Sequence, residues 1–171
     1  MLTTKDVIRA YLKKNKSNNT AANDNNRIQV YLKSSCRPNP GKGYWASISD
    51  NGLSEVTFSG SVERSTNHRI ELTAAVETLK RFKNGERITL YTSLKLLPDA
   101  MNRYIHEWKA NDWLNSDNKK PQNLDLWLNL YNQYRRLRVK WVYISSSKLD
   151  QKHPMLAFLL DVQFDHSKHA A

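Results

Sequence analysis

The feature that most constrains the fold is a change of hydrophobic period within residues 27–92. Three strand-like runs come first, at residues 27–32, 44–49 and 56–62, and turn-forming residues separate them. The Asn51-Gly52 step between the second and third runs favours a tight hairpin, so these runs are expected to pair antiparallel. Apolar residues then recur at helical spacing over residues 69–82, and residues 87–92 form a further strand-like run.

The C-terminal half continues this mixture of strands and helices. Helices are predicted at residues 101–110 and 124–135, a last strand at 137–144 and a last helix at 153–166. Pro98 is expected to interrupt the segment that precedes the first of these helices. The order of elements predicts an α/β domain over residues 27–171.

The N-terminal segment differs from this domain in composition. Val7, Ile8, Tyr11 and Leu12 recur at helical spacing among basic residues, which predicts a short basic amphipathic helix over residues 1–16. Residues 17–26 are almost entirely small or polar and are expected to form a linker. The helix is expected to dock on the main domain or on a partner, and the sequence leaves both alternatives open.

Charge points to the class of partner. The chain has 171 residues and a formal net charge of +11, and its Lys and Arg residues are spread along its length. A basic surface on one folded domain favours polyanionic partners, above all nucleic acid. The alternatives are a charge that serves solubility and an acidic protein partner.

Cysteine and apolar content restrict the environment. The single Cys36 excludes an intramolecular disulfide and a cysteine zinc site. No signal-peptide-like run and no stretch of about 20 apolar residues is present, so a cytoplasmic protein without a membrane partner is expected.

Three local strings add a family resemblance. They are Asn39-Pro40-Gly41, the segment from Ser65 to Leu72, and the segment from Tyr104 to Trp127 that includes Lys119-Lys120-Pro121. Together with the order of elements, these strings resemble ribonuclease HI, whose members cut the RNA strand of an RNA/DNA hybrid. The resemblance implies an RNase H-like fold. Its five-stranded mixed sheet has three antiparallel strands followed by two parallel ones, and helices flank it.

The same resemblance implies that the catalytic residues are mostly replaced. Family members hold two divalent ions with four carboxylates. The corresponding positions here are Lys33, Glu71, Ser93 and Leu160, with Asp161 one residue after the last of them. An offset of one residue rotates a helical side chain by about 100°. Glu71 is therefore expected to be a vestigial catalytic residue, with no metal site and no Mg²⁺ cofactor.

Two further expectations concern this centre. The Lys33 ammonium is expected either to replace the metal ion as partner of Glu71 or to extend into solvent. The family's mobile histidine corresponds to Ser147, although the loop is longer here and His153 follows it.

The binding residues of the family are better preserved. Asn39, Thr66 and Asn67 correspond to a pocket that grips a phosphate of the DNA strand, although each residue also suits a turn or a helix cap. Arg69 either adds charge to this surface or forms a surface ion pair. The family's basic protrusion is diluted, and its candidate nucleic-acid contacts here are Trp108, Lys109, Trp113, Lys119 and Lys120. Trp108 suits core packing as well.

The sequence supports three functional interpretations. The first is a catalytically inactive ribonuclease HI-like protein that binds an RNA/DNA hybrid, double-stranded RNA or structured RNA. The second is a protein-interaction scaffold that uses the N-terminal helix or the basic run at residues 135–140. The third is a residual nuclease built on Glu71, Asp161 and a recruited residue such as Asp50.

Overall fold

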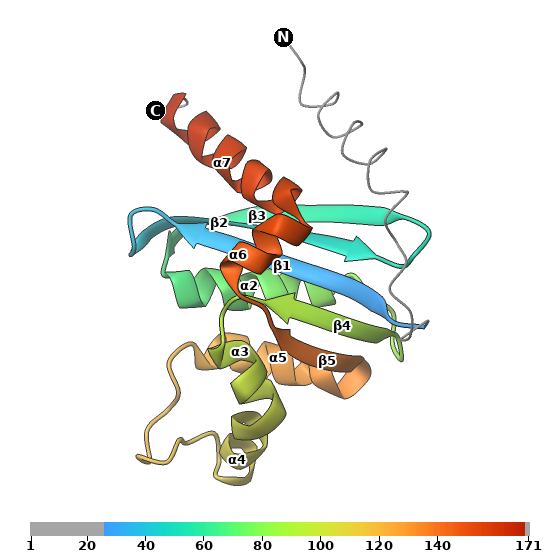
Figure 1. Cartoon of the computed structure of the whole chain (residues 1–171). Helices are drawn as coiled ribbons and strands as arrows, with labels where there is room; N and C mark the ends of the chain where they lie inside the picture. Colours follow the sequence, from blue (N-terminus) through green and yellow to red (C-terminus); the bar gives the residue numbers. More distant parts are fainter. Residues whose placement is uncertain (1–25, 170–171) are drawn as a thin grey trace.

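The computed structural model describes residues 26–169 of the chain, so the predicted helix at residues 1–16 and nearly all of the predicted linker lie outside the described residues. A five-stranded sheet forms the centre, with the spatial order β3-β2-β1-β4-β5 (Figure 1). The strands are β1 (Ile28–Cys36), β2 (Gly41–Asp50), β3 (Glu55–Ser65), β4 (Arg87–Thr92) and β5 (Arg138–Tyr143).

The sheet is mixed, as predicted. β1 pairs antiparallel with β2, and β2 pairs antiparallel with β3. β4 lies parallel to β1 on its other side, and β5 lies parallel to β4 and forms an edge of the sheet. β1 runs to Cys36, further than its apolar pattern indicates, because its ladder with β2 continues as far as the Cys36–Gly43 pair.

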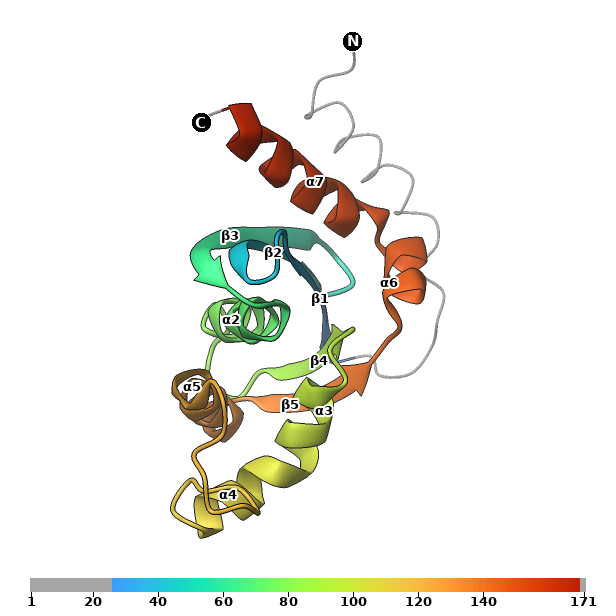
Figure 2. The ribbon, with the colours of Figure 1, turned by 90° about the vertical axis from the view of Figure 1, so that its left-hand side faces the viewer.

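One face of the sheet is covered by the helices α2 (Asn67–Leu79) and α5 (Leu124–Arg136), as Figure 2 shows. Alternate strand residues such as Val30, Leu32 and Leu90 point to this side and share its apolar core. Thr66 caps α2 by accepting a hydrogen bond from the backbone N–H of Arg69 at 3.2 Å. This cap fixes the start of the helix that carries Glu71.

The opposite face is covered by α6 (Ser146–Lys152) and α7 (Pro154–His169) (Figures 1 and 2). Tyr31 and Ile48 of the sheet pack with Leu156 and Leu160 of α7 in a second apolar cluster. The short helix α6 was not predicted, because Leu149 is the one buried apolar residue in it. Among residues 26–169, no helix is both long enough and apolar enough to cross a membrane.

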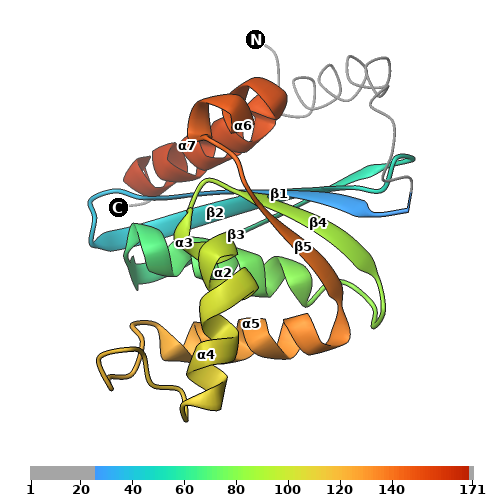
Figure 3. The same ribbon diagram turned by 60° about the horizontal axis from the view of Figure 1, so that its bottom comes forward.

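A single helical segment runs away from the sheet after β4 (Figure 3). It consists of α3 (Leu96–Asp99), a wider π-helical turn at Ala100–Tyr104, and α4 (Ile105–Ala110). The prediction that Pro98 interrupts this segment was wrong, because Pro98 lies in the first turn of α3, where its missing N–H breaks no helical hydrogen bond.

Candidate nucleic-acid interface and candidate catalytic centre

Lys33, the first of the four carboxylate positions, lies on β1. Its side chain is on the face of the sheet that carries α6 and α7. Its neighbour Leu32 points into the core under α2, whereas Tyr31 packs under α7, so alternation places Lys33 on the α7 side. The Lys33 side chain is only 16% exposed. An ammonium in this position is largely withdrawn from water and needs a partner.

That partner is a carboxylate that sequence reasoning missed. Lys33 Nζ donates a hydrogen bond to Asp150 Oδ1 at 2.5 Å and another to Ser146 Oγ at 3.2 Å. Both acceptors belong to α6. The expectation that Lys33 pairs with Glu71 is corrected, because the oxygens of Glu71 are taken by other groups. The alternative of a Lys33 side chain extended into solvent does not fit its low exposure either.

Glu71 is buried, and its oxygens accept hydrogen bonds from hydroxyl groups rather than from a cation. Thr92 Oγ1 donates to its Oε1 at 2.5 Å, and Ser34 Oγ donates to its Oε2. Burial raises the pKa of Glu71, and the two hydroxyl bonds and the nearby Lys33 charge only partly oppose this effect. The carboxyl group therefore favours its neutral form more than an exposed glutamate does.

The remaining carboxylate positions supply no ligand to this centre. Ser93 follows β4 and offers only a hydroxyl. Leu160 is 1% exposed and packs in the apolar cluster under α7. Asp161 faces outward, where Arg37 Nη1 lies 3.6 Å from its Oδ1. Asp50 pairs with Gln29 in the β1–β2 ladder, about 13 Å along β1 from Lys33, so it does not join the centre.

The histidine that follows the longer loop is also withdrawn from the centre. The His153 ring lies 4.0 Å from the Tyr31 ring between their centroids, and burial lowers the pKa of His153 to about 4. Ser147 lies in α6, where its hydroxyl is 3.3 Å from that of Ser145. The position of the family's mobile histidine therefore carries a serine, and the imidazole of His153 is buried away from a substrate.

These residues do not fit a pair of divalent ions. A hard cation needs several oxygen ligands around one point, and an ammonium already bound to Asp150 occupies the position of the first ligand. Within residues 26–169, no group of three or more His, Cys, Asp or Glu side chains could hold a metal ion.

A comparison with family models places the chain. The model of RNase H matches residues 25–151, which is more than half of the sequence. The chain belongs to the RNase H family. Its fold, with a mixed five-stranded sheet flanked by helices, agrees with this assignment.

Curated relatives have the same family name. The ribonuclease H of Novosphingobium aromaticivorans is 35% identical over 117 residues, which is 68% of this chain and 82% of the relative. The ribonuclease H of Francisella tularensis subsp. novicida is 38% identical over 120 residues, which is 70% of this chain and 78% of the relative.

Solved structures share the fold at low identity. LC9-RNase H1, described as a type 1 RNase H with the type 2 active-site motif, superposes with a TM-score of 0.64 at 18% identity, over 84% of this chain and 76% of that protein. LC11-RNase H1 in complex with an RNA/DNA hybrid superposes with a TM-score of 0.57 at 15% identity, over 81% and 99%.

The candidate phosphate pocket of this RNase H family member lies where the β1–β2 loop meets the start of α2. The backbone N–H of Asn67 donates to Asn39 Oδ1 at 3.2 Å, and the backbone N–H of Cys36 donates to Asn67 Oδ1 at 3.0 Å. These bonds and the Thr66 cap use the acceptor oxygens of the three side chains. Their donor groups have no partner among residues 26–169, so the cluster presents N–H and O–H groups that suit an anion.

Arg69, in contrast, serves the fold. Its guanidinium donates two hydrogen bonds to Asp125, at 3.0 and 2.6 Å, and a third to Asn123 Oδ1 at 3.2 Å. The paired bonds join the first turns of α2 and α5. Of the two alternatives for Arg69, the ion pair is the one present, and its charge is already compensated by Asp125.

The aromatic residues of the protrusion pack against α5. The Trp108 and Trp127 rings meet edge to face with 5.5 Å between centroids, and the Trp113 and Tyr131 rings do the same at 5.5 Å. Trp108 and Trp113 are therefore partly buried packing residues. Lys109 lies over the Tyr131 ring at 5.4 Å and remains exposed.

The other cations of the site differ in role. Lys119 and Lys120 are exposed in the loop before α5. In the basic run at residues 135–140, Arg136 turns inward and donates to the carbonyl oxygens of Leu79 and Phe82, at 2.6 and 2.5 Å, and so caps the end of α2. The run therefore divides into this capping residue and the exposed side chains of Arg135, Arg138 and Lys140.

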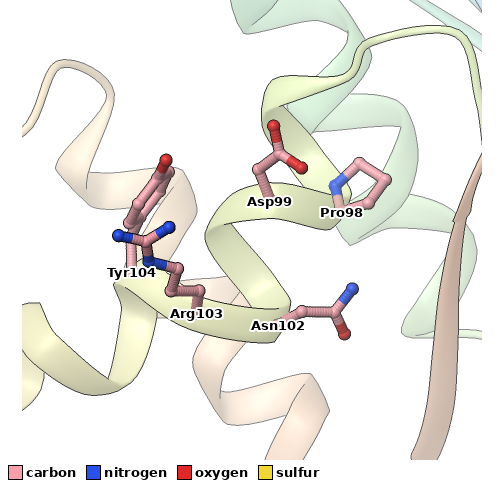
Figure 4. Close-up of a pocket in the computed structure, with 5 residues that line it drawn as sticks. All are labelled: Pro98, Asp99, Asn102, Arg103 and Tyr104. Atoms are coloured by element: carbon pink, nitrogen blue, oxygen red, sulfur yellow. The ribbon is translucent and has the colours of Figure 1, made fainter.

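A pocket on the helical segment after β4 adds residues that the sequence analysis missed. Figure 4 shows its lining: Pro98, Asp99, Asn102, Arg103 and Tyr104. The Arg103 guanidinium lies 5.2 Å from the centre of the Tyr104 ring, and Asn102 is exposed beside it. Arg103 also pairs with Glu107, with its Nε 3.7 Å from Oε1, so the aromatic face and the amide of this pocket suit a base better than a phosphate. No motif in the sequence distinguishes these residues.

Proposed function

We propose that this RNase H family member binds double-helical nucleic acid, an RNA/DNA hybrid in particular, without hydrolysing it. The observation that carries the proposal is the Lys33–Asp150 ion pair beside a Glu71 carboxyl group already bound by two hydroxyls. The position that would receive metal ions contains an internal cation instead, and Mg²⁺ has no set of ligands there.

Support for binding comes from the pocket at the C-terminal end of β1. Asn39, Thr66 and Asn67 bring together donor groups that have no partner among residues 26–169, and a phosphate needs no metal ion to accept hydrogen bonds from them. The exposed Lys109, Lys119 and Lys120 extend the positive surface from the protrusion. LC11-RNase H1, which shares the fold, has been solved in complex with an RNA/DNA hybrid.

Charge favours this function over a structural role. The formal charge of +11 attracts a polyanion at long range, and binding releases counterions from the duplex. The affinity is therefore expected to fall steeply with salt. Asn102, Arg103 and Tyr104 are expected to contribute further contacts from the pocket on the helical segment.

The test combines binding with hydrolysis. Fluorescence anisotropy with a labelled RNA/DNA hybrid, double-stranded RNA, duplex DNA and single strands is carried out at several salt concentrations, in Mg²⁺ and in EDTA. We expect tight, salt-sensitive binding of one duplex class. The affinity should be equal in Mg²⁺ and in EDTA, and it should be lower for Thr66→Ala. Each bound substrate is then incubated with Mg²⁺ or Mn²⁺.

Two results would refute the proposal. Cleavage of the hybrid that disappears in Glu71→Gln would show a working metal site. Weak and equal binding to all nucleic acids would remove the nucleic-acid function and leave the scaffold interpretation, with the exposed cations of β5 as a place to search for an acidic protein partner.

A further inference from the structure

The Lys33–Asp150 pair joins a mostly buried cation to a more exposed carboxylate. Lys33 lies in the middle of the sheet, where its residue pairs with Ala46 of β2, and its side chain is 16% exposed. Asp150 lies on the seven-residue helix α6, and its side chain is 42% exposed. Release of the Asp150 carboxylate to water therefore costs less than release of the Lys33 ammonium.

The surroundings of Lys33 suit an oxyanion. Its Nζ has three N–H groups, of which Asp150 and Ser146 accept two, and the third has no partner among the described residues. Hydroxyls of Ser145 and Ser147 and the exposed Lys148 lie on the same segment. A phosphodiester oxygen can accept from an ammonium in the same way as the carboxylate of Asp150.

Lys33 and the phosphate pocket are close together along β1, with the Lys33 side chain on the α6–α7 face and the pocket at the start of α2 on the other face. Both lie on β1, because the Cys36 N–H that binds Asn67 is three residues beyond Lys33, about 10 Å along the strand. One strand of a duplex advances about 3.4 Å along the helix axis for each phosphate. A duplex that binds the pocket and spans this end of the sheet therefore comes within a few nucleotides of Lys33.

We propose that Lys33 is a phosphate-binding residue of this interface, and that Asp150 is an internal competitor that a nucleic-acid phosphate displaces. The inference rests on the proposed function, because it needs a bound duplex. It goes further in assigning the phosphate contact to the position of a former metal ligand and in giving α6 a role in setting the affinity.

The experiment is a double-mutant cycle on duplex affinity. The full chain, Asp150→Asn, Lys33→Met and the double variant are titrated with a labelled RNA/DNA hybrid in EDTA at several salt concentrations. Asp150→Asn is expected to bind roughly fivefold more tightly, because it removes the competing charge. Lys33→Met is expected to bind several-fold more weakly, with a salt slope smaller by about one.

The cycle separates displacement from a general charge effect. In the Lys33→Met background, Asp150→Asn should improve binding no more than Asp165→Asn does in the wild-type protein. Asp165 is a matched control, because it is exposed on α7 and paired with Lys168 at 4.0 Å, away from Lys33. Equal effects of Asp150→Asn in both backgrounds would overturn the proposal.

Folding of the variants is checked by circular dichroism and thermal unfolding. If Lys33→Met does not fold, Lys33→Arg takes its place, since it keeps the charge and should retain the tightening by Asp150→Asn. If the wild-type protein binds the hybrid but the effects of Lys33→Met and Asp150→Asn on affinity are independent, this inference alone is refuted. A wild-type protein that binds no nucleic acid would refute both this inference and the proposed function.

Discussion

The Lys33 ammonium and the Asp150 carboxylate lie 2.5 Å apart and join the central strand β1 to the short helix α6. The chain positions of the two residues are far apart, and only the fold brings them together. Because Lys33 is mostly buried, this pair differs from the exposed ion pairs of the molecule, such as Lys168–Asp165, whose side chains are 76% and 72% exposed. The difference predicts a measurable effect on stability.

Substitution of Asp150 by Asn should lower the free energy of unfolding by about 1–2 kcal/mol, because it leaves a partly buried ammonium without its counter-charge. The partial exposure of Asp150 keeps the loss below that of a fully buried pair. Asp165→Asn should change stability by less than about 0.5 kcal/mol. Urea unfolding monitored by tryptophan fluorescence measures both, and equal losses would contradict the expectation.

The free energy of unfolding of Glu71→Gln should rise relative to that of the wild-type protein as the pH rises. Burial raises the folded-state pKa of Glu71 above its ordinary value of 4.5, so the wild-type protein loses stability as the pH climbs from 4.5 through the folded pKa. Glutamine has no such transition. Unfolding free energies at pH 4, 6 and 8 test this; a destabilisation that grows with pH would mean that a charged Glu71 is favoured in the folded state.

For His153, the stability of the fold should change with pH in the opposite direction, falling as the solution becomes more acidic. Its folded-state pKa of about 4 lies below the ordinary 6.5, so the stability that the neutral ring contributes is present above pH 6.5 and is lost as the pH falls towards 4. The loss is at most about 3 kcal/mol. His153→Phe, which keeps a ring against Tyr31, should flatten this part of the curve. His166→Phe, at an exposed position, serves as the control.

Substitution of Arg136 should lower the stability of the fold more than substitution of its neighbour Arg135. Arg136→Ala removes the guanidinium donors from the carbonyl oxygens of Leu79 and Phe82, of which Leu79 keeps the Phe82 N–H, and should cost about 2 kcal/mol. Arg135→Ala changes an exposed side chain and should cost less than about 0.5 kcal/mol. Thermal unfolding of the two variants decides, and similar midpoints would remove the capping role.

A metal site should return only when its ligands return. The double variant Lys33→Asp/Ser93→Asp places carboxylates beside Glu71, and Mn²⁺ should then raise its thermal midpoint. At a Mn²⁺ concentration of ten times the dissociation constant, the free energy of unfolding should increase by about 1.4 kcal/mol. The wild-type protein should show no such shift. A comparable Mn²⁺ shift in both proteins would mean that a metal site exists without these two substitutions.

The elements along the chain followed from local patterns, because the first three strand-like runs combine β-branched residues with turn formers between them, whereas the five-stranded mixed sheet was implied by the family resemblance. Helix α6 did not, since a helix with one buried apolar residue has no hydrophobic period to detect. It forms because Ser145 caps it and Leu149 anchors it.

The site was predictable where a motif marks it and not elsewhere. Asn39, Thr66 and Asn67 do cluster, as the resemblance implied. The partner of Lys33 was missed because Asp150 belongs to no motif. The role of Arg69 depends on Asp125, which is distant in the chain, and a tertiary contact of this kind leaves no local signal.

The π-helical turn at Ala100–Tyr104 also matters for how this family member tolerates change in length. In a regular α-helix, residues four apart drift by about 40° at each step, so Leu97, Met101 and Ile105 would spread over about 80°. The wider turn corrects this phase, and all three are at most 1% exposed. Deletion of one residue here would convert the wide turn into a regular α-helical turn and leave Trp108 close to its present orientation against Trp127, so this segment should tolerate the loss of one residue better than the gain of one.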